Sequence, residues 1–323
     1  MLIRLGSLLF AAAMLAAPSV AEAARSRVVT TYADSALFPV EQGFAPGRTT
    51  TLVFHQRLRT GWHVYWMNPG DSGLPLELDW RLPEGFAAGD ALYPTPEHIS
   101  LGPLANYGHH GEPVFLLPVT APATARIGDT VELSVKATWL ICEDICVPED
   151  GEFALSLPVT ASPAIDHEAA ALAEGARAAA PQPFEADAVF SVADGAVVLS
   201  MRAPDGPVTD GYFFPEPEGL IEPVAPQRIE RRGDRLAIAM TPGFSIASAG
   251  EKLPGVFGYV DDDGTRRGLA FTAARSAEPI EPPAAAAAAG LSPGPAAGAG
   301  SGSGGAGLAG LPYLLLAAFL GGL

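Results

Sequence analysis

Short apolar runs, separated by glycine and proline, occupy the middle of this chain of 323 residues and restrict its fold more than any other feature. Runs of this length with no long helical period are typical of antiparallel β-sandwiches. We therefore expect an all-β protein, with one β domain over residues 25–163 and a second, β-sandwich-like domain over residues 184–276. In the first domain the expected strands are Val28–Tyr32, Thr49–Phe54, Val114–Val119, Val131–Leu140 and Phe153–Val159.

The second β domain is predicted from its turns. Apolar runs flank Asp194-Gly195, Gly233 and Asp263-Gly264, and short glycine-containing loops between such runs are typical of β-hairpins. The one convincing helical stretch, Asp166–Ala180, precedes this domain. We expect residues 164–183 to connect the two domains through that helix.

The start of the chain has the pattern of a secretory signal peptide. The apolar run Leu5–Ala17 follows Arg4, and Ala21-Glu22-Ala23 matches an A-x-A-like cleavage site. We therefore expect residues 1–24 to be removed on export, most simply to a bacterial periplasm or an equivalent oxidising compartment.

The end of the chain is expected to be a tether. Residues 277–310 are mostly Ala, Gly, Ser and Pro, a composition that cannot bury enough apolar surface to fold and is typical of a flexible linker. Residues 311–323 are apolar and uncharged, but the run is shorter than the roughly 20 residues that a membrane helix needs. We expect it to be the start of a truncated transmembrane helix that holds the exported domains at the inner membrane.

Charge and motifs exclude several classes of function. The chain has 19 Lys+Arg against 36 Asp+Glu, a net charge of −17, and nucleic-acid binding needs clustered cations. The sequence has no phosphate-binding loop, nucleophile elbow or clustered zinc motif, so we expect no nucleic-acid partner, no cofactor and no resident metal. Asp261-Asp262-Asp263-Gly264 is more typical of a solvated hairpin turn than of a calcium loop, because no glutamate follows at the required spacing.

The chemistry is predicted to lie in the two cysteines, Cys142 and Cys146. A pair four residues apart in an exported protein is expected to form a disulfide. As a structural staple it would add little, because a loop of five residues gives about 2 kcal/mol in the chain-entropy model. The intervening Glu143 and Asp144 disfavour a thiolate. This suits a carrier whose disulfide is attacked by a partner's thiolate, so a redox role is favoured over a structural one.

Copper binding is the alternative function for the same cysteines. Two thiolates can chelate Cu(I) with a further methionine or histidine ligand, and His109, His110 and Met67 are candidates. Adjacent histidines on a loop flanked by glycine are, however, expected to be ordinary surface residues. A scaffold sandwich with a purely structural disulfide is the remaining alternative.

Three segments carry a family resemblance: Gly61–Pro75, Leu101–Gly108 and Trp139–Pro148. In this order they resemble the N-terminal periplasmic domain of the DsbD family of thiol:disulfide interchange proteins, with the suppressor-of-copper-sensitivity (ScsB) type as the closest subgroup. The resemblance covers residues 28–160 well and 184–275 loosely. It implies an immunoglobulin-like β-sandwich for the first domain.

The resemblance also implies a dithiol–disulfide relay. The pair would receive electrons from a membrane-embedded cysteine pair of the same, longer protein. It would pass them to periplasmic thioredoxin-like proteins, which is the activity of a protein-disulfide reductase. In this scheme Cys146 forms the mixed disulfides and Cys142 resolves them.

A cap over the cysteines is the last implication of the resemblance. His63 and Tyr65 fall where the family has aromatic residues beside the pair, and Asn106 and Tyr107 fall in the cap loop that shields it. This chain has Leu104-Ala105-Asn106 where the DsbD cap carries an acidic pair and a phenylalanine, and its cysteine spacing is shorter than in DsbD itself.

Overall fold

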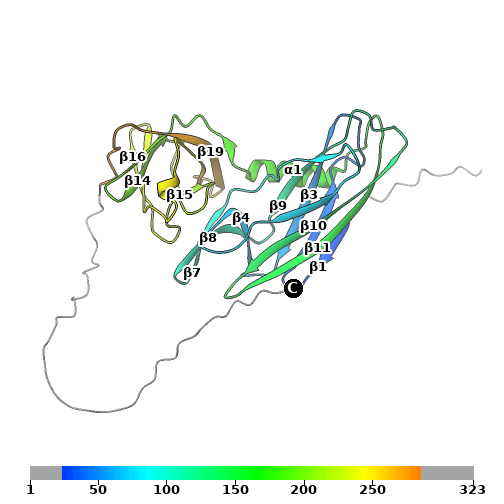
Figure 1. Ribbon diagram of the computed structural model, residues 1–323, viewed down its shortest axis with the longest axis horizontal. Helices are drawn as coiled ribbons and strands as arrows, with labels where there is room; N and C mark the ends of the chain where they lie inside the picture. Colours follow the sequence, from blue (N-terminus) through cyan, green and yellow to red (C-terminus); the bar gives the residue numbers. More distant parts are fainter. Residues whose placement is uncertain (1–23, 285–323) are drawn as a thin grey trace, which may run out of the picture. The chain divides into compact units, whose positions relative to one another are not determined.

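Three β-sheets and one α-helix make up residues 24–284, the part of the chain that the computed structural model describes (Figure 1). These residues belong to one compact unit. Residues 1–23 of the predicted signal peptide, the predicted membrane segment and most of the predicted linker lie outside the described residues. Within residues 24–284 no helix is long and apolar enough to cross a membrane.

The first part of the chain forms two sheets. One has the strand order β1-β2-β3-β9-β6, and the other has the order β11-β10-β4-β8-β7, with β5 pairing β10. The strands of the first sheet are β1 (Ser26–Val29), β2 (Ala33–Pro39), β3 (Thr49–Leu58), β6 (Ala87–Ala88) and β9 (Val114–Thr120). Those of the second are β4 (His63–Gly70), β5 (Glu77–Arg81), β7 (Glu97–Leu101), β8 (Leu104–His110), β10 (Thr130–Cys142) and β11 (Cys146–Pro158).

One apolar core joins these two sheets. Along β10 the buried side chains alternate with more exposed ones, as expected for a strand with one face on a core. Phe54 of the first sheet packs edge-on against Phe153 of the second, with ring centroids 5.3 Å apart, and lies 6.3 Å from Trp139. The predicted all-β character of this part is therefore confirmed, and its two sheets share one core.

One expected strand is wrong in detail. Residues 28–32 do not form a continuous strand, because the chain bends between β1 and β2. The largely buried carboxylate of Glu149 holds this bend. It accepts hydrogen bonds from the Thr30 hydroxyl (2.6 Å), the Tyr32 amide (3.0 Å) and the Trp139 indole (3.3 Å).

The predicted helix is confirmed as α1 (His167–Ala179). The Asp166 side chain caps it by accepting from the amides of Glu168 and Ala169, the usual role of an aspartate at this position. The buried face of the helix consists of Ala169, Ala173 and Ala176, which pack against apolar side chains of β2, β3 and β9.

The second part of the chain forms one sheet with the order β15-β18-β19-β13-β14-β17-β16, to which β12 adds by pairing β19. The three predicted hairpins are confirmed as β13–β14, β16–β17 and β18–β19. In the first, Asp194 and Gly195 both have positive φ, at 50° and 73°, as a tight hairpin turn requires. The elements are β12 (Gln182–Pro183), β13 (Val189–Ala193), β14 (Ala196–Arg202), β15 (Thr209–Pro215), β16 (Arg228–Arg232), β17 (Arg235–Met240), a 3-10 turn (Ile246–Ser248), β18 (Lys252–Val260) and β19 (Arg266–Arg275).

The two parts share contacts behind β4 and β8. The rings of Trp66 and Tyr107 pack against Phe214 of β15, with centroids 6.2 and 5.0 Å apart. The Asn68 amide donates to the carbonyl of Pro215 at 2.7 Å. Residues of β4, β8 and β15 are therefore buried in a common core. The division into separate domains at residue 184 stays a prediction.

Candidate functional site

Strands β10 and β11 form a long hairpin (Figure 1). The two cysteines lie at its end. Cys142 is the last residue of β10 and pairs with Cys146, the first of β11, and their sulfurs form a disulfide. Cys142 is fully buried, at 0% exposure, whereas Cys146 is exposed. Of the two cysteines, only Cys146 is therefore exposed on the side from which a thiolate in solvent would approach.

Tyr65 of β4 covers the buried sulfur. Its hydroxyl donates to Cys142 Sγ at 2.7 Å and lies 3.5 Å from Cys146 Sγ. Burial raises the pKa of Tyr65 to about 12, because the phenolate would lose its solvation. The hydroxyl therefore keeps its proton at neutral pH and acts at the disulfide as a hydrogen-bond donor.

Asn106 of β8 connects Tyr65 to its surroundings. Its Nδ2 donates to the Tyr65 hydroxyl oxygen at 3.3 Å and lies 3.4 Å from His63 Nε2. Its Oδ1 accepts a hydrogen bond from the Ser72 hydroxyl at 3.0 Å. Asn106 is fully buried, so these neighbours fix its amide.

A glycine lets Tyr65 reach this position. Gly73 has φ of +110°, a conformation that side chains rarely adopt, and a Cβ there would overlap the Tyr65 ring. The segment after β4 can therefore cross the tyrosine closely only because residue 73 has no side chain.

His63 is the neighbour of Cys142 in the sheet, opposite it in the register between β4 and β10. The imidazole is 2% exposed, and burial lowers the pKa of His63 to about 4. The ring is therefore neutral at physiological pH, which fits Nε2 accepting a hydrogen bond from Asn106.

Of the predicted cap residues, His63, Tyr65 and Asn106 are brought together beside Cys142, whereas Tyr107 is placed elsewhere. Its hydroxyl lies 3.1 Å from that of Tyr212 in the second part of the chain. Adjacent residues of a strand point to opposite faces, so Asn106 and Tyr107 cannot both face the cysteines. A shielding role for these residues stays a prediction.

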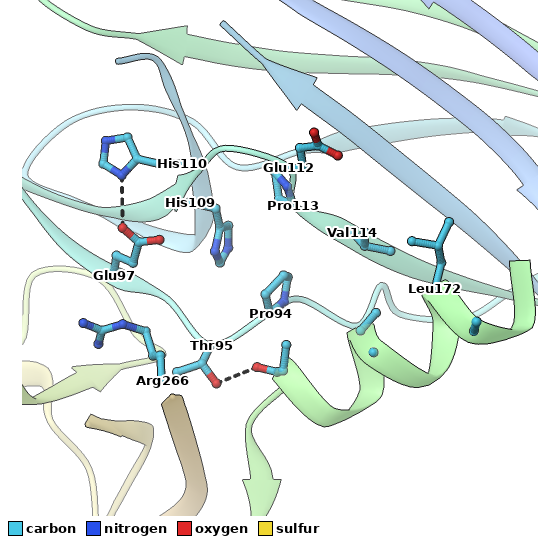
Figure 2. Close-up of a pocket in the computed structure, with 14 residues that line it drawn as sticks. Pro94, Thr95, Glu97, His109, His110, Glu112, Pro113, Val114, Leu172 and Arg266 are labelled. Carbon is cyan, nitrogen blue, oxygen red and sulfur yellow. Dashed lines mark hydrogen bonds and ion pairs between the residues drawn. The ribbon is translucent and has the colours of Figure 1, made fainter. Parts of the chain in front are cut away.

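The adjacent residues His109 and His110 were expected to lie on the surface, and the structure differs from this expectation for one of them. His109 is 3% exposed and its Nε2 has no hydrogen-bond partner, so the surface prediction is wrong for this residue, whereas His110 is exposed. Both line a cavity of about 410 Å³ between β7, β8, β9, α1 and β19. Figure 2 shows them near Glu97, whose carboxylate lies 3.0 Å from His110 Nδ1.

His109 and His110 do not form part of a cluster of metal ligands that would support the copper alternative. Among residues 24–284, the one group of three or more metal-ligating side chains in mutual reach is Asp261, Asp262 and Asp263 in the β18–β19 turn. There Asp261 already accepts a hydrogen bond from Arg267 at 2.8 Å. Copper binding by the cysteines stays a prediction.

Ser72 is a site residue that the sequence analysis missed. It lies in the segment Gly61–Pro75 that carried the family resemblance, but nothing in its neighbourhood signals a contact with Asn106, which is far away in the chain. Only the pairing of β4 with β8 brings the two together.

Fold and site together define a class: a β-sandwich domain with an asymmetric disulfide at the end of one hairpin. Residues 33–158 match the family model described as thiol:disulfide interchange protein DsbD, N-terminal, and this part of the chain is a DsbD-family N-terminal domain. The match covers less than half of the chain, and a search among curated proteins finds no match.

Solved structures extend the likeness beyond the family match. The N-terminal periplasmic domain of ScsB from Proteus mirabilis is similar with a TM-score of 0.60 and 17% identity, over 79% of this chain and 100% of that one. The two therefore share a fold. A yeast GGA1 GAE domain matches 42% of this chain and 99% of its own with 12% identity, and its TM-score of 0.25 carries no structural argument.

Proposed function

We propose that this chain is a periplasmic thiol:disulfide interchange module that relays electrons through Cys142 and Cys146. The observation that carries the proposal is the asymmetry of the pair, with Cys146 exposed and Cys142 buried beneath Tyr65. Exchange requires a thiolate to reach one sulfur of a disulfide and to displace the other. An exposed and a buried cysteine divide these two roles between them.

The loading of electrons proceeds in two displacements. A thiolate of the donor attacks Cys146 Sγ, the bond between Cys142 and Cys146 breaks, and its electron pair stays on Cys142 Sγ. The donor's second thiolate then attacks the donor sulfur of the mixed disulfide and releases Cys146. The donor dithiol becomes a disulfide and the cysteine pair becomes a dithiol, so two electrons and two protons are transferred.

Unloading reverses these displacements. Cys146 attacks the disulfide of an oxidised partner, and Cys142 then displaces that partner from Cys146. The partner leaves as a dithiol, and the Cys142–Cys146 disulfide forms again. This makes the module a protein-disulfide reductase, with Cys146 as the sulfur that forms mixed disulfides and Cys142 as the resolving sulfur.

The proposed redox partners are inferred from the family that residues 33–158 match. We propose a membrane-embedded cysteine pair in a longer form of this protein as donor and periplasmic thioredoxin-like proteins as acceptors. The DsbD-family match and the periplasmic origin of the ScsB domain support a periplasmic location for the module and its acceptors. A flexible linker to a membrane segment would raise the effective concentration of the module near its donor.

Trapping of mixed disulfides tests the proposal. A Cys142→Ser variant, incubated with an oxidised thioredoxin-like protein, is expected to accumulate a mixed disulfide through the exposed Cys146. The matched Cys146→Ser variant is expected to accumulate at least tenfold less, because Cys142 is buried. Equal trapping by the two variants would contradict the assigned roles, and trapping by neither would contradict the proposed function.

A further inference from the structure

We infer that Ser72 and Asn106 are positioning residues that fix the Tyr65 hydroxyl as a hydrogen-bond donor to Cys142 Sγ. Through this bond Tyr65 makes Cys142 the leaving sulfur when the disulfide is attacked and the resolving sulfur afterwards. The inference rests on the proposed function, since it assigns a task within the same exchange reaction. It makes Tyr65 a catalytic residue rather than only a shield.

The hydrogen bonds run in one direction. The Ser72 hydroxyl donates to Asn106 Oδ1 at 3.0 Å, which directs the amide nitrogen of Asn106 away from Ser72. That nitrogen donates to the Tyr65 hydroxyl oxygen at 3.3 Å. Since the oxygen then accepts from Asn106, its own proton is free to point to Cys142 Sγ, 2.7 Å away.

His63 supports the same direction. The second proton of the Asn106 amide faces His63 Nε2 at 3.4 Å, and a neutral imidazole nitrogen in this place is an acceptor. The oxygen of the Asn106 amide thus accepts from Ser72, and its nitrogen donates to His63. His63 Nε2 is occupied in this arrangement, so it does not serve as the base for a cysteine.

The bond acts on the sulfur that gains charge. When a thiolate attacks Cys146, negative charge develops on Cys142 Sγ, which is fully buried and therefore not exposed to solvent. Within residues 24–284, Tyr65 is the one side chain hydrogen-bonded to this sulfur. A preoriented donor at such a position stabilises the developing anion and so favours breakage of the bond. A more stable thiolate is also a better leaving group.

The same bond favours the resolving step. In the mixed disulfide between Cys146 and a partner, Cys142 must be a thiolate to attack. A donor aimed at its sulfur favours the charged form, which increases the reactive fraction when the thiol pKa lies above the ambient pH. The effect opposes the repulsion from Glu143 and Asp144, which lie between the two cysteines in the turn.

A Tyr65→Phe substitution tests the inference, with Tyr93→Phe as the matched control. Tyr93 is also buried, and its hydroxyl meets only the carbonyl of Leu76 at 3.4 Å, away from the cysteines. We expect Tyr65→Phe to slow reduction of the disulfide by dithiothreitol about tenfold, the effect of losing a hydrogen bond to a charged group. Tyr93→Phe should leave the rate unchanged.

Two further variants separate positioning from packing. Asn106→Asp keeps the shape of the side chain but makes it an acceptor, so it would draw the Tyr65 proton away from the sulfur and slow reduction with Tyr65 still present. Ser72→Ala removes the bond to Asn106 Oδ1 and the polar contact of Ser72 with Tyr65, and it should slow reduction by a few-fold. Because neither variant removes bulk from the disulfide, loss of packing would not explain these rates.

A second readout does not depend on exchange with any partner. In a Cys146→Ser background, the pKa of the Cys142 thiol is followed by ¹³C NMR of its labelled Cβ, with and without Tyr65→Phe. We expect the substitution to raise this pKa. Unchanged pKa and unchanged rates would overturn the inference even if the module exchanges electrons. A raised pKa in a protein that traps no partner would overturn the proposed function instead.

Discussion

Burial governs the chemistry of single residues in this protein, most clearly in His63 and His109. Both imidazoles are nearly inaccessible to water, and desolvation lowers the pKa of each to about 4. His63 stays neutral beside the disulfide, where a charged ring would compete for the hydrogen bond that Asn106 makes. His109 stays neutral in the wall of a cavity with an unpaired Nε2.

From the lowered pKa values of these two histidines we predict that acid destabilises the fold between about pH 6.5 and 4. The unfolded chain binds their protons near pH 6.5 and the folded protein only near pH 4, so the unfolded state binds more protons in between. The free energy of unfolding therefore falls as the pH drops from about 6.5 to 4, by about 2 kcal/mol for each histidine at pH 5. Urea unfolding at pH 7 and pH 5 measures this.

His109→Phe is the control for that window. It keeps a ring edge-on to Phe115 without a titrating group, so the loss between pH 7 and 5 should shrink by about 2 kcal/mol. His55, whose pKa is also lowered by burial, contributes to the loss that remains. Arginine partners lower the pKa of some carboxylates, such as Asp34 and Asp261. Their contribution to the free energy of unfolding is lost only at a pH below 5. Stability that does not change between pH 7 and 5 would rule out two buried neutral histidines.

Single residues also mark the limit of what the sequence could predict. Cysteines four residues apart pointed to a disulfide, and the structure contains it. The contrast between a buried Cys142 and an exposed Cys146 could not be predicted from spacing, since it depends on Tyr65, a residue of another strand. The burial of His109 was missed for a similar reason, because helix α1 helps to enclose the cavity that it lines.

At the level of elements, the pairing of β10 with β11 extends far beyond the disulfide at the end of their hairpin. The two strands stay in register from Thr130 opposite Pro158 to the cysteine pair itself. The disulfide therefore closes only the short turn at the end of strands that backbone hydrogen bonds and the apolar core already hold together. Such a position suits a bond that is broken and made repeatedly.

We accordingly predict a small stability difference between the oxidised and reduced forms. Closing a loop of five residues contributes about 2 kcal/mol to the free energy of unfolding, so reduction should cost no more than about that amount. Urea unfolding with and without reductant measures it, with a Cys142→Ser/Cys146→Ser variant as a reference that reductant cannot affect. A difference above about 4 kcal/mol would show a structural staple.

Some elements were predictable and others were not, for a physical reason. Hairpins with glycine turns and the helix capped by Asp166 follow local rules and were found where expected. Strands β4 and β8 were not predicted as strands, because consecutive residues along both of them are buried. One face of these strands packs on the sandwich core and on the second part of the chain, and the other face is buried at the disulfide site. Burial of both faces removes the alternation that identifies a strand.

On the scale of the whole molecule, the second part of the chain supports the strands that carry the site. Tyr212 and Phe214 of β15 pack on Tyr107, the neighbour of Asn106 in β8. Trp66, the neighbour of Tyr65 in β4, packs on Phe214 as well. The two residues that order the disulfide environment thus lie on strands whose opposite face is covered by the third sheet.

This shared core predicts that residues 24–284 unfold in one cooperative transition. A fragment ending at residue 183 would expose Trp66 and Tyr107 to water and should be less stable by several kcal/mol, given the apolar area uncovered. Denaturant unfolding followed by tryptophan fluorescence and by circular dichroism measures both. Two separate transitions, or a fragment as stable as the longer chain, would show that the parts fold independently.

The reduction potential of the Cys142–Cys146 disulfide, measured for the exported chain in defined thiol buffers, tests the central claim most directly. Structural disulfides of exported proteins have potentials below about −300 mV, whereas exchangeable ones lie higher. An electron relay requires a value well above −300 mV, and this is the result that we predict. A value below −300 mV would mean that the pair is a structural staple and would contradict the proposed function.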